Sequence, residues 1–206
     1  MKKTRTKKNW IKEHLSDEFV KRAQKDGFRS RAAYKFIEMN DKYHLIRPND
    51  RIVDLGSAPG SWSQAASSLI SNNGKIFAID LLPMDDVKNT TFIQGDFREL
   101  SILQKLEELL ENTVVDLVIS DMAPNMSGMK AVDQPRAMYL AELAYDMAIK
   151  VLRPGGSFIT KIFMGEGFDQ YMKDARINFE KVLTRKPDSS RARSPEVYLV
   201  AKKFKG

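Results

Sequence analysis

The sequence contains no cysteine among its 206 residues. Disulfides, thiolate metal ligands and reactions with a cysteine nucleophile are therefore excluded. No apolar run approaches the roughly 20 residues that a membrane-spanning helix needs. The basic N-terminus also lacks the apolar block of a signal peptide. We therefore expect a cytoplasmic protein that does not associate with a membrane.

Acidic residues are outnumbered: 34 Lys and Arg face 27 Asp and Glu, a net charge of +7. This balance favours a polyanionic partner, although a well-solvated surface would have the same composition. The two histidines, His14 and His44, lack partners at metal-ligand spacing, so we expect no metal site. Hydrophobic residues make up 42% of the chain, enough for the core of one α/β domain.

The chain is predicted to form one domain after a short arm. Residues 1–8 are basic, polar and without apolar spacing, so we expect a flexible arm. Residues 9–206 then form a single domain that begins with a helical lead-in, residues 9–48. Its first helix is indicated by apolar residues at every fourth position, namely Ile11, Leu15, Phe19 and Ala23. A second helix is predicted from Ser30, as N-cap, to about His44.

The rest of the chain alternates between two kinds of segment. Strands are predicted at 51–54, 75–80, 91–94, 114–120, 157–163, 181–186 and 197–203. Helical patterns fill most gaps, at 61–70, 100–111, 136–151 and 168–179. This alternation predicts an α/β fold with a mostly parallel sheet and helices on both faces. The last two strands are too close for a helical crossover, which predicts an antiparallel hairpin.

The stretch RIVDLGSAPGSWSQ predicts a strand, a tight turn and the start of a helix. Gly56 and Gly60 allow the backbone to approach a ligand there. Their spacing differs from that of dinucleotide sites and P-loops, which disfavours a nicotinamide oxidoreductase. Pro59 also removes a backbone N–H that a phosphate cradle would use. We therefore predict a ligand without pyrophosphate, and S-adenosylmethionine, an adenosine carrying an amino-acid arm, suits this turn.

Three acids end successive predicted strands: Asp54, Asp80 and Asp96. Asp80 can accept hydrogen bonds from both ribose hydroxyls, and Asp96 is placed to accept from an adenine amino group. Each could alone be a helix cap or a turn residue, but the repetition favours a ligand site. Trp62 either shapes the same pocket or packs in the core.

The loop SDMAPNMSG carries Asp121 but lacks the double proline and aromatic residue common in amino-group methyltransferases. Pyrimidine C5 methylation needs a cysteine, so an oxygen acceptor remains. Lys161 lies among apolar residues near the end of the fifth strand, where an unpaired lysine is unusual. A second cation such as Lys35, with removal from water, would favour a neutral amine that accepts a proton. Alternatively, Lys161 protects an edge strand from association.

The predicted hairpin brings further polar residues to the same sheet edge. Glu196 begins the last strand, and antiparallel pairing places that end beside Asp121 and Lys161. The hairpin loop adds two arginines that could hold phosphates. The candidate RNA contacts are therefore Arg191 and Arg193, together with Arg29 and Arg31 before the second helix.

The motifs RSRAAYKFIE, VDLGSAPGSWSQ, SDMAPNMSG, LRPGGSFITKIFMGEGFD and RKPDSSRARSPEVYLVA together resemble the FtsJ-type ribosomal RNA methyltransferases. The resemblance extends from about residue 30 to residue 201. It implies the Rossmann-like fold of S-adenosylmethionine-dependent methyltransferases, with an antiparallel seventh strand. It also implies methylation of the ribose 2′-hydroxyl of a uridine in the A loop of 23S rRNA, within the 50S subunit.

The resemblance assigns roles to individual residues. The family's catalytic Lys-Asp-Lys-Glu set falls on Lys35, Asp121, Lys161 and Glu196. Lys161 would accept the proton and Asp121 would orient it, while Lys35 and Glu196 would shape the acceptor site. Cofactor contacts carry over to Gly60, Trp62, Asp80, Asp96 and Asp121, and the turn adds Asp54, Gly56 and Pro59. Ser57 and Ser61 replace Ala and Gly of many relatives, without expected loss of binding.

Family resemblance alone leaves the RNA open, because related proteins methylate tRNA anticodon loops or mRNA caps. The short chain and the two loops MAPNMSG and PDSSRARS favour the bacterial rRNA type. An RNA-binding assembly factor without chemistry is a further alternative, which the complete four-residue set disfavours. We expect a monomer.

Overall fold

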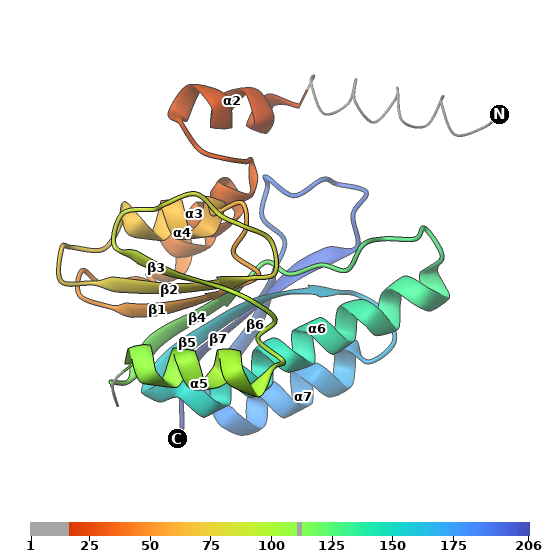
Figure 1. The fold of residues 1–206 in the computed structure, drawn as a ribbon. Helices are drawn as coiled ribbons and strands as arrows, with labels where there is room; N and C mark the ends of the chain where they lie inside the picture. The colour runs from red at the N-terminus through yellow and green to blue at the C-terminus, as the bar shows by residue number, and fades with distance from the viewer. Residues whose placement is uncertain (1–16, 111–112) are drawn as a thin grey trace.

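A seven-stranded sheet in the order β3-β2-β1-β4-β5-β7-β6 forms the centre of the fold (Figure 1). This computed structural model describes residues 17–110 and 113–206. The strands are β1 (Arg51–Leu55), β2 (Lys75–Asp80), β3 (Thr90–Gln94), β4 (Val115–Ser120), β5 (Leu152–Phe163), β6 (Phe179–Arg185) and β7 (Glu196–Phe204). Only β7 runs against its neighbours β5 and β6, which confirms the predicted class, the antiparallel last strand and the hairpin.

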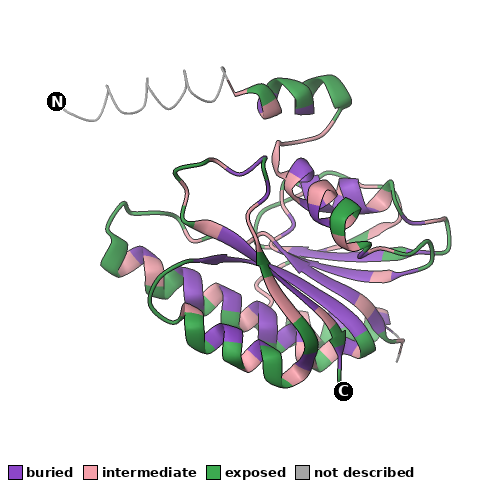
Figure 2. Ribbon diagram, turned by 180° about the vertical axis from the view of Figure 1, so that it is seen from behind, coloured by how far each residue is buried: buried purple, intermediate pink, exposed green. Residues whose placement is uncertain are grey.

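Helices cover both faces of the sheet (Figures 1 and 2). One face carries α3 (Ala32–Tyr43) and α4 (Ser61–Ser67), with α2 (Glu18–Asp26) beyond them. The other face carries α5 (Leu100–Leu110), α6 (Lys130–Val151) and α7 (Phe168–Asn178). No helix in the described ranges is long and apolar enough to cross a membrane. The predicted arm, residues 1–8, and the positions Ile11, His14 and Leu15 lie outside the described residues.

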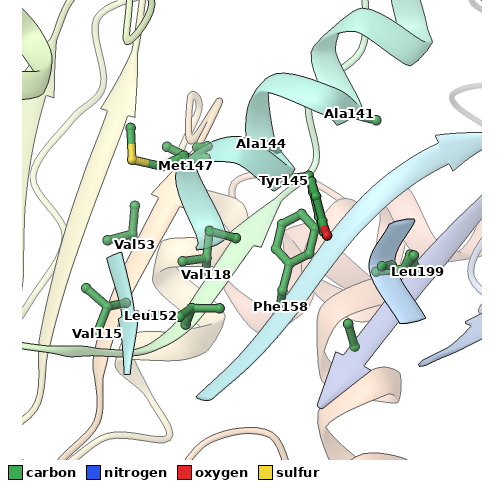
Figure 3. Packing of buried hydrophobic residues seen from close by; sticks show 14 of the residues in the cluster. Val53, Val115, Val118, Ala141, Ala144, Tyr145, Met147, Leu152, Phe158 and Leu199 are labelled. Atoms are coloured by element: carbon green, nitrogen blue, oxygen red, sulfur yellow. The ribbon is translucent and has the colours of Figure 1, made fainter. Parts of the chain in front are cut away.

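Each face of the sheet has its own hydrophobic core. On β4, Val118 packs toward α5, α6 and α7, whereas Leu117 and Ile119 pack toward α3 and α4. Figure 3 shows Phe158 of β5 against Tyr145 of α6, with ring centroids 6.2 Å apart. Burial on both faces explains why these strands are almost continuously apolar in sequence.

Three helix starts differ from the prediction. The apolar spacing predicts one helix from Ile11 to Asp26, but α2 begins at Glu18. It begins there because Asp17 is extended and its side chain accepts the N–H of Phe19 as an N-cap.

α6 begins at Lys130, before the predicted start at 136, although Pro135 lies inside it. The preceding loop is held by Asp133, whose carboxylate accepts the backbone N–H groups of Ser127 and Gly128 at 2.8 and 2.9 Å. Side-chain capping of this kind depends on the loop conformation, which helical spacing does not show. Likewise α3 begins at Ala32, and Ser30 Oγ accepts the N–H of Ala32 at 3.2 Å without being the N-cap residue itself.

Candidate active site

The four predicted catalytic residues meet at the carboxyl edge of the parallel strands. β7 starts at this edge because it is antiparallel to β5, so Glu196 pairs with Phe163 and Tyr198 pairs with Lys161. Asp121 follows the last residue of β4, directly beside β5. The expected juxtaposition of β4, β5 and β7 therefore holds.

Lys161 and Asp121 form a buried ion pair. Lys161 Nζ lies 3.1 Å from Asp121 Oδ1 and donates to the backbone oxygen of the same residue at 2.6 Å. The Lys161 side chain is only 8% exposed. One hydrogen bond and one ion pair to the same residue thus hold the amine in place.

Tyr198 completes this arrangement and was missed by the sequence reasoning. Its hydroxyl donates to Asp121 Oδ1 at 2.7 Å, and its side chain is fully buried. Burial, followed by the charges of Asp121 and Glu196, raises the pKa of Tyr198 well above its ordinary value. The phenol therefore stays protonated and acts as a donor. Its position two residues after Glu196, on the same strand face, is the signal that could have identified it.

Lys35 and Glu196 form a second ion pair beside Tyr198. Lys35 comes from α3, and its Nζ lies 2.7 Å from Glu196 Oε1. The two side chains are 12% and 13% exposed. Lys35 Nζ also lies 5.6 Å from the centre of the Tyr198 ring. The predicted set is thus two ion pairs, one on each side of a buried tyrosine.

A small pocket of about 60 Å³ adjoins Asp121. Gly56 and Gly60 have positive φ angles of 73° and 101°, which favour glycine. A Cβ at Gly56 would lie 2.2 Å from Cγ of Met122, so that side chain covers the turn. The pocket is lined by Ser30, Ala32, Asp54, Gly56, Ser57, Ala58, Pro59, Ser61, Trp62 and Asp121. Most of the predicted turn contacts are therefore assembled around one cavity.

Asp54 is the most buried acid of the pocket, with an exposure of 1%. Burial raises its pKa to about 7, and the nearby charges of Asp121 and Asp80 act in the same direction. The hydroxyl of Ser63 donates to Asp54 Oδ2 at 2.6 Å, which partly offsets the increase.

Trp62 belongs to both the pocket and the core. Its Nε1 donates to the backbone oxygen of Ala32 at 2.9 Å. Its ring packs against Phe36 and Tyr198, with centroids 5.1 and 5.6 Å away. Trp62 therefore both lines the pocket and packs in the core, so the two alternatives considered from the sequence are both correct.

The other two strand-end acids have different surroundings. Asp80 joins the glycine turn to the β2–β3 loop, because it accepts the N–H groups of Ala58 and Leu82 at 2.9 and 2.8 Å. Asp96 does not line the pocket, and Arg98 Nε donates to both of its oxygens at 2.8 Å. Hydrogen bonding by Arg98 lowers the pKa of Asp96. Cofactor binding by Asp80 and Asp96 stays a prediction.

Arg29 contacts the glycine turn that lines the pocket and the β2–β3 loop beside that turn. Its guanidinium donates to the backbone oxygens of Pro59, Asp85 and Asp86 at 2.8, 2.9 and 2.8 Å. Its own N–H donates to Gln64 Oε1 at 3.1 Å. Arg29 thus ties the lead-in to the glycine turn and to the β2–β3 loop. Its predicted contact with RNA stays a prediction.

The remaining predicted arginines surround the hairpin loop. Arg31 donates to the backbone oxygen of Ser189 and pairs with Asp17. Arg191 Nε lies 3.9 Å from Asp17 Oδ2. Arg193 is exposed in the same loop. Arg191 and Arg193 therefore lie on the segment that leads into Glu196, and Arg31 contacts that segment from the start of α3. Their contact with RNA stays a prediction.

Known proteins resemble this chain over nearly its whole length. A ribosomal RNA large subunit methyltransferase E from Pseudomonas fluorescens is 58% identical over 206 residues, covering 100% of this chain and 99% of the relative. The protein with the same description from Marinobacter nauticus is 55% identical over 205 residues, with the same two coverages.

Solved structures agree with the fold. The crystal structure of a ribosomal RNA methyltransferase from Plasmodium falciparum matches with a TM-score of 0.77 at 33% identity, covering 87% of this chain and 100% of that chain. A methyltransferase from Streptococcus mutans in complex with S-adenosylhomocysteine shares the fold at 14% identity and a TM-score of 0.52, covering 84% and 96%. The family described as FtsJ-like methyltransferase matches residues 28–204. The chain therefore belongs to the FtsJ-like methyltransferase family.

Proposed function

We propose that this protein methylates the ribose 2′-hydroxyl of a uridine in the A loop of 23S rRNA, in an assembled or late-stage 50S subunit, using S-adenosylmethionine. The observation that carries the chemistry is the pairing of Lys161 with Asp121 and of Lys35 with Glu196 around the buried Tyr198. The descriptions of the relatives as large-subunit rRNA methyltransferases support the choice of RNA.

The turn between β1 and α4 suits S-adenosylmethionine. Its glycines leave the backbone accessible, and each oxygen of Asp80 accepts one hydrogen bond and keeps a lone pair for a ribose hydroxyl. The present pocket is smaller than the several hundred Å³ that ligand sites need. Met122, which covers Gly56, is an unbranched side chain that can change rotamer to admit the cofactor. When bound, the cofactor supplies an electrophilic sulfonium methyl group.

Lys161 is the proposed proton acceptor. A neutral amine has two N–H groups and one lone pair. The backbone oxygen of Asp121 accepts one N–H group, and Oδ1 of the same residue lies 3.1 Å from Nζ. In the proposed mechanism the lone pair on Nζ takes the proton. The 2′-oxygen forms a bond to the methyl carbon, its proton passes to Lys161, and the C–S electron pair stays on sulfur. Tyr198 stays protonated and holds Asp121 in place.

Positive side chains near the site would hold the RNA backbone. We place phosphate contacts at Arg31, Arg191 and Arg193, and at the basic residues 1–8 that precede the single domain 9–206 in sequence. We further propose that the protein acts as a cytoplasmic monomer. Its activity should fall with added salt, because phosphate contacts release counterions.

The test is transfer of tritiated methyl from S-adenosylmethionine to undermethylated 50S subunits, with naked 23S rRNA and tRNA in parallel. Label recovered as 2′-O-methyluridine from the A loop would support the acceptor atom, base and substrate together. Label in tRNA alone would retain the chemistry and overturn the target. Absence of label despite cofactor binding would favour an RNA-binding assembly factor. On a metal-free RNA substrate a chelator should have little effect, and strong inhibition by EDTA there would contradict the mechanism.

A further inference from the structure

Four cations gather at the end of the sheet opposite the candidate active site. We call Arg47, Lys181, Lys202 and Lys203 the far-edge cluster. β7 carries Glu196 at the active-site edge and Lys202 six residues later, about 20 Å away at the rise of an extended strand. Figure 1 shows the C-terminal end of β7 on the side of the sheet away from the blue hairpin loop. The cluster is therefore separate from the phosphate contacts proposed near Glu196.

Like charges face one another within the cluster. Lys181 of β6 is the direct register partner of Lys202 of β7. Opposed like charges destabilise a sheet. Lys202 is held in this position because its Nζ donates to the backbone oxygen of Tyr43 at 2.6 Å. Burial, followed by the charges of Lys181, Arg47 and Lys203, lowers the pKa of Lys202. The sheet thus concentrates positive potential at this end.

Two carboxylates lie near the cluster. Asp50 accepts the backbone N–H of Arg47 at 2.8 Å, and burial raises the pKa of Asp50, while the charge of Arg47 acts against that increase. Glu180 Oε2 pairs with Lys203 Nζ at 2.9 Å. Within residues 17–110 and 113–206, no carboxylate lies within ion-pair distance of Arg47, Lys181 or Lys202. Arg47 and Lys181 are exposed. Two exposed cations, Arg47 and Lys181, are therefore available to a polyanion, with the half-buried Lys202 of β7 adding to the positive potential.

We infer that the far-edge cluster binds the phosphate backbone of an rRNA segment outside the acceptor loop. This inference rests on the proposed function, because it takes rRNA as the substrate. Lysine ammonium groups act as point charges toward phosphate and do not read bases. A contact about 20 Å from the catalytic residues would orient a large, folded RNA while adding nothing to the chemical step.

The test compares two variants that each remove two positive charges. Arg47→Gln/Lys181→Gln alters the cluster, whereas Lys88→Gln/Lys105→Gln removes two exposed lysines elsewhere. At about 0.1 M monovalent salt, we expect the cluster variant to raise the KM for undermethylated 50S subunits roughly 5- to 10-fold. Its plot of log KM against log salt should be shallower by about 1.5. The kcat and the cofactor affinity should not change, and the control should change KM less than about twofold.

A charge-retaining variant guards against a folding defect. Arg47→Lys/Lys181→Arg keeps both cations and should keep the wild-type KM. Equal effects of the cluster variant and the control would overturn the inference, because the loss would then reflect net charge alone. An unchanged KM and salt slope in the cluster variant would overturn it as well.

Binding of naked 23S rRNA, measured by filter binding without methyl transfer, separates this inference from the proposed function. Weaker binding by the cluster variant would support the cluster even if the wild-type protein methylates no RNA. The cluster variant could instead raise the KM for 50S subunits and bind deproteinised 23S rRNA as the wild type does. The cluster would then contact a ribosomal protein, which overturns the inference. If 50S subunits are methylated equally well by the wild type and the cluster variant, the proposed function stands and the proposed role of the cluster is wrong.

Discussion

β4 and β5 are joined by an ion pair near each of their ends. At the amino end, Arg153 Nε lies 2.6 Å from Asp116 Oδ1, and the other oxygen of Asp116 accepts the N–H of Arg51 at 2.8 Å. At the carboxyl end, Lys161 Nζ lies 3.1 Å from Asp121 Oδ1. The same two strands are therefore bridged by one acid–base pair near each end.

The chemical difference between arginine and lysine suits the two ion pairs to different roles. The guanidinium of Arg153 is 32% exposed and keeps its charge, so this pair can only hold the strands together. The side chain of Lys161 is 8% exposed and ends in an amine, a group that serves as a general base in enzymes, unlike a guanidinium. A buried lysine beside a pocket is therefore suited to proton transfer, whereas an arginine in the equivalent pair is suited to structure.

The largest expected effect is at Lys161. Lys161→Met and Lys161→Arg should both lower the single-turnover rate by at least about 10³-fold, because neither side chain can accept the proton at neutral pH. Cofactor affinity measured by calorimetry should stay within about twofold of wild type. A Lys161→Arg variant with the wild-type rate would remove the distinction between the two ion pairs.

Asp54 differs from Asp116 and Asp121, because no cation pairs with it in the described structure. Its pKa is raised to about 7 in the folded state, so the protonated acid stabilises the fold at low pH. This contribution is complete below the unfolded pKa near 4 and is lost as pH rises through about 7. Urea unfolding should show wild type losing on the order of 2 kcal/mol relative to Asp54→Asn between about pH 5 and pH 8. Parallel pH profiles for the two proteins would contradict this assignment.

Arg29 is a second structural arginine, this time beside the pocket. Arg29→Gln should raise the KM for S-adenosylmethionine about 10-fold, because charge-assisted bonds to the glycine turn and to the β2–β3 loop are lost. The kcat at saturating cofactor should be nearly unchanged. Steady-state kinetics with either substrate varied will measure this. A rise confined to the KM for RNA would instead support the predicted RNA contact.

Tyr198→Phe tests the hydrogen bond that distinguishes Asp121 from Asp116. It removes one donor to Asp121 and retains the packed ring. The kcat should fall about fivefold, which corresponds to the net value of about 1 kcal/mol for one hydrogen bond. Both KM values should stay near wild type. A loss of thermal stability without any change in kcat would make Tyr198 a packing residue only.

The smallest effect is expected at the other ion pair. Arg153→Gln should lower the free energy of unfolding by less than about 1 kcal/mol, because the pair is partly exposed to solvent. Methyl-transfer kinetics should not change. A clear fall in kcat would show that the amino end of β5 influences the site, contrary to the comparison.

Much of this arrangement was predictable from local patterns. The apolar strand segments, the glycine turn and the short hairpin connection specify which residues end at one edge of the sheet. The start of α6 was predicted too late because Pro135 normally marks a boundary. The loop that precedes α6 is held by Asp133, whose bonds to Ser127 and Gly128 require a conformation that no periodic pattern describes.

The sequence by itself determined the α/β class, the order of helices and strands, and the residue types brought to the carboxyl edge. Only the tertiary structure decided which groups pair there. Lys35 reaches Glu196 across 161 positions, and Lys161 reaches Asp121 across 40. Such contacts depend on strand order and register, which also place Tyr198 opposite Lys161 and Lys181 opposite Lys202. Local propensity sets the elements, whereas long-range packing sets the partners of each charge.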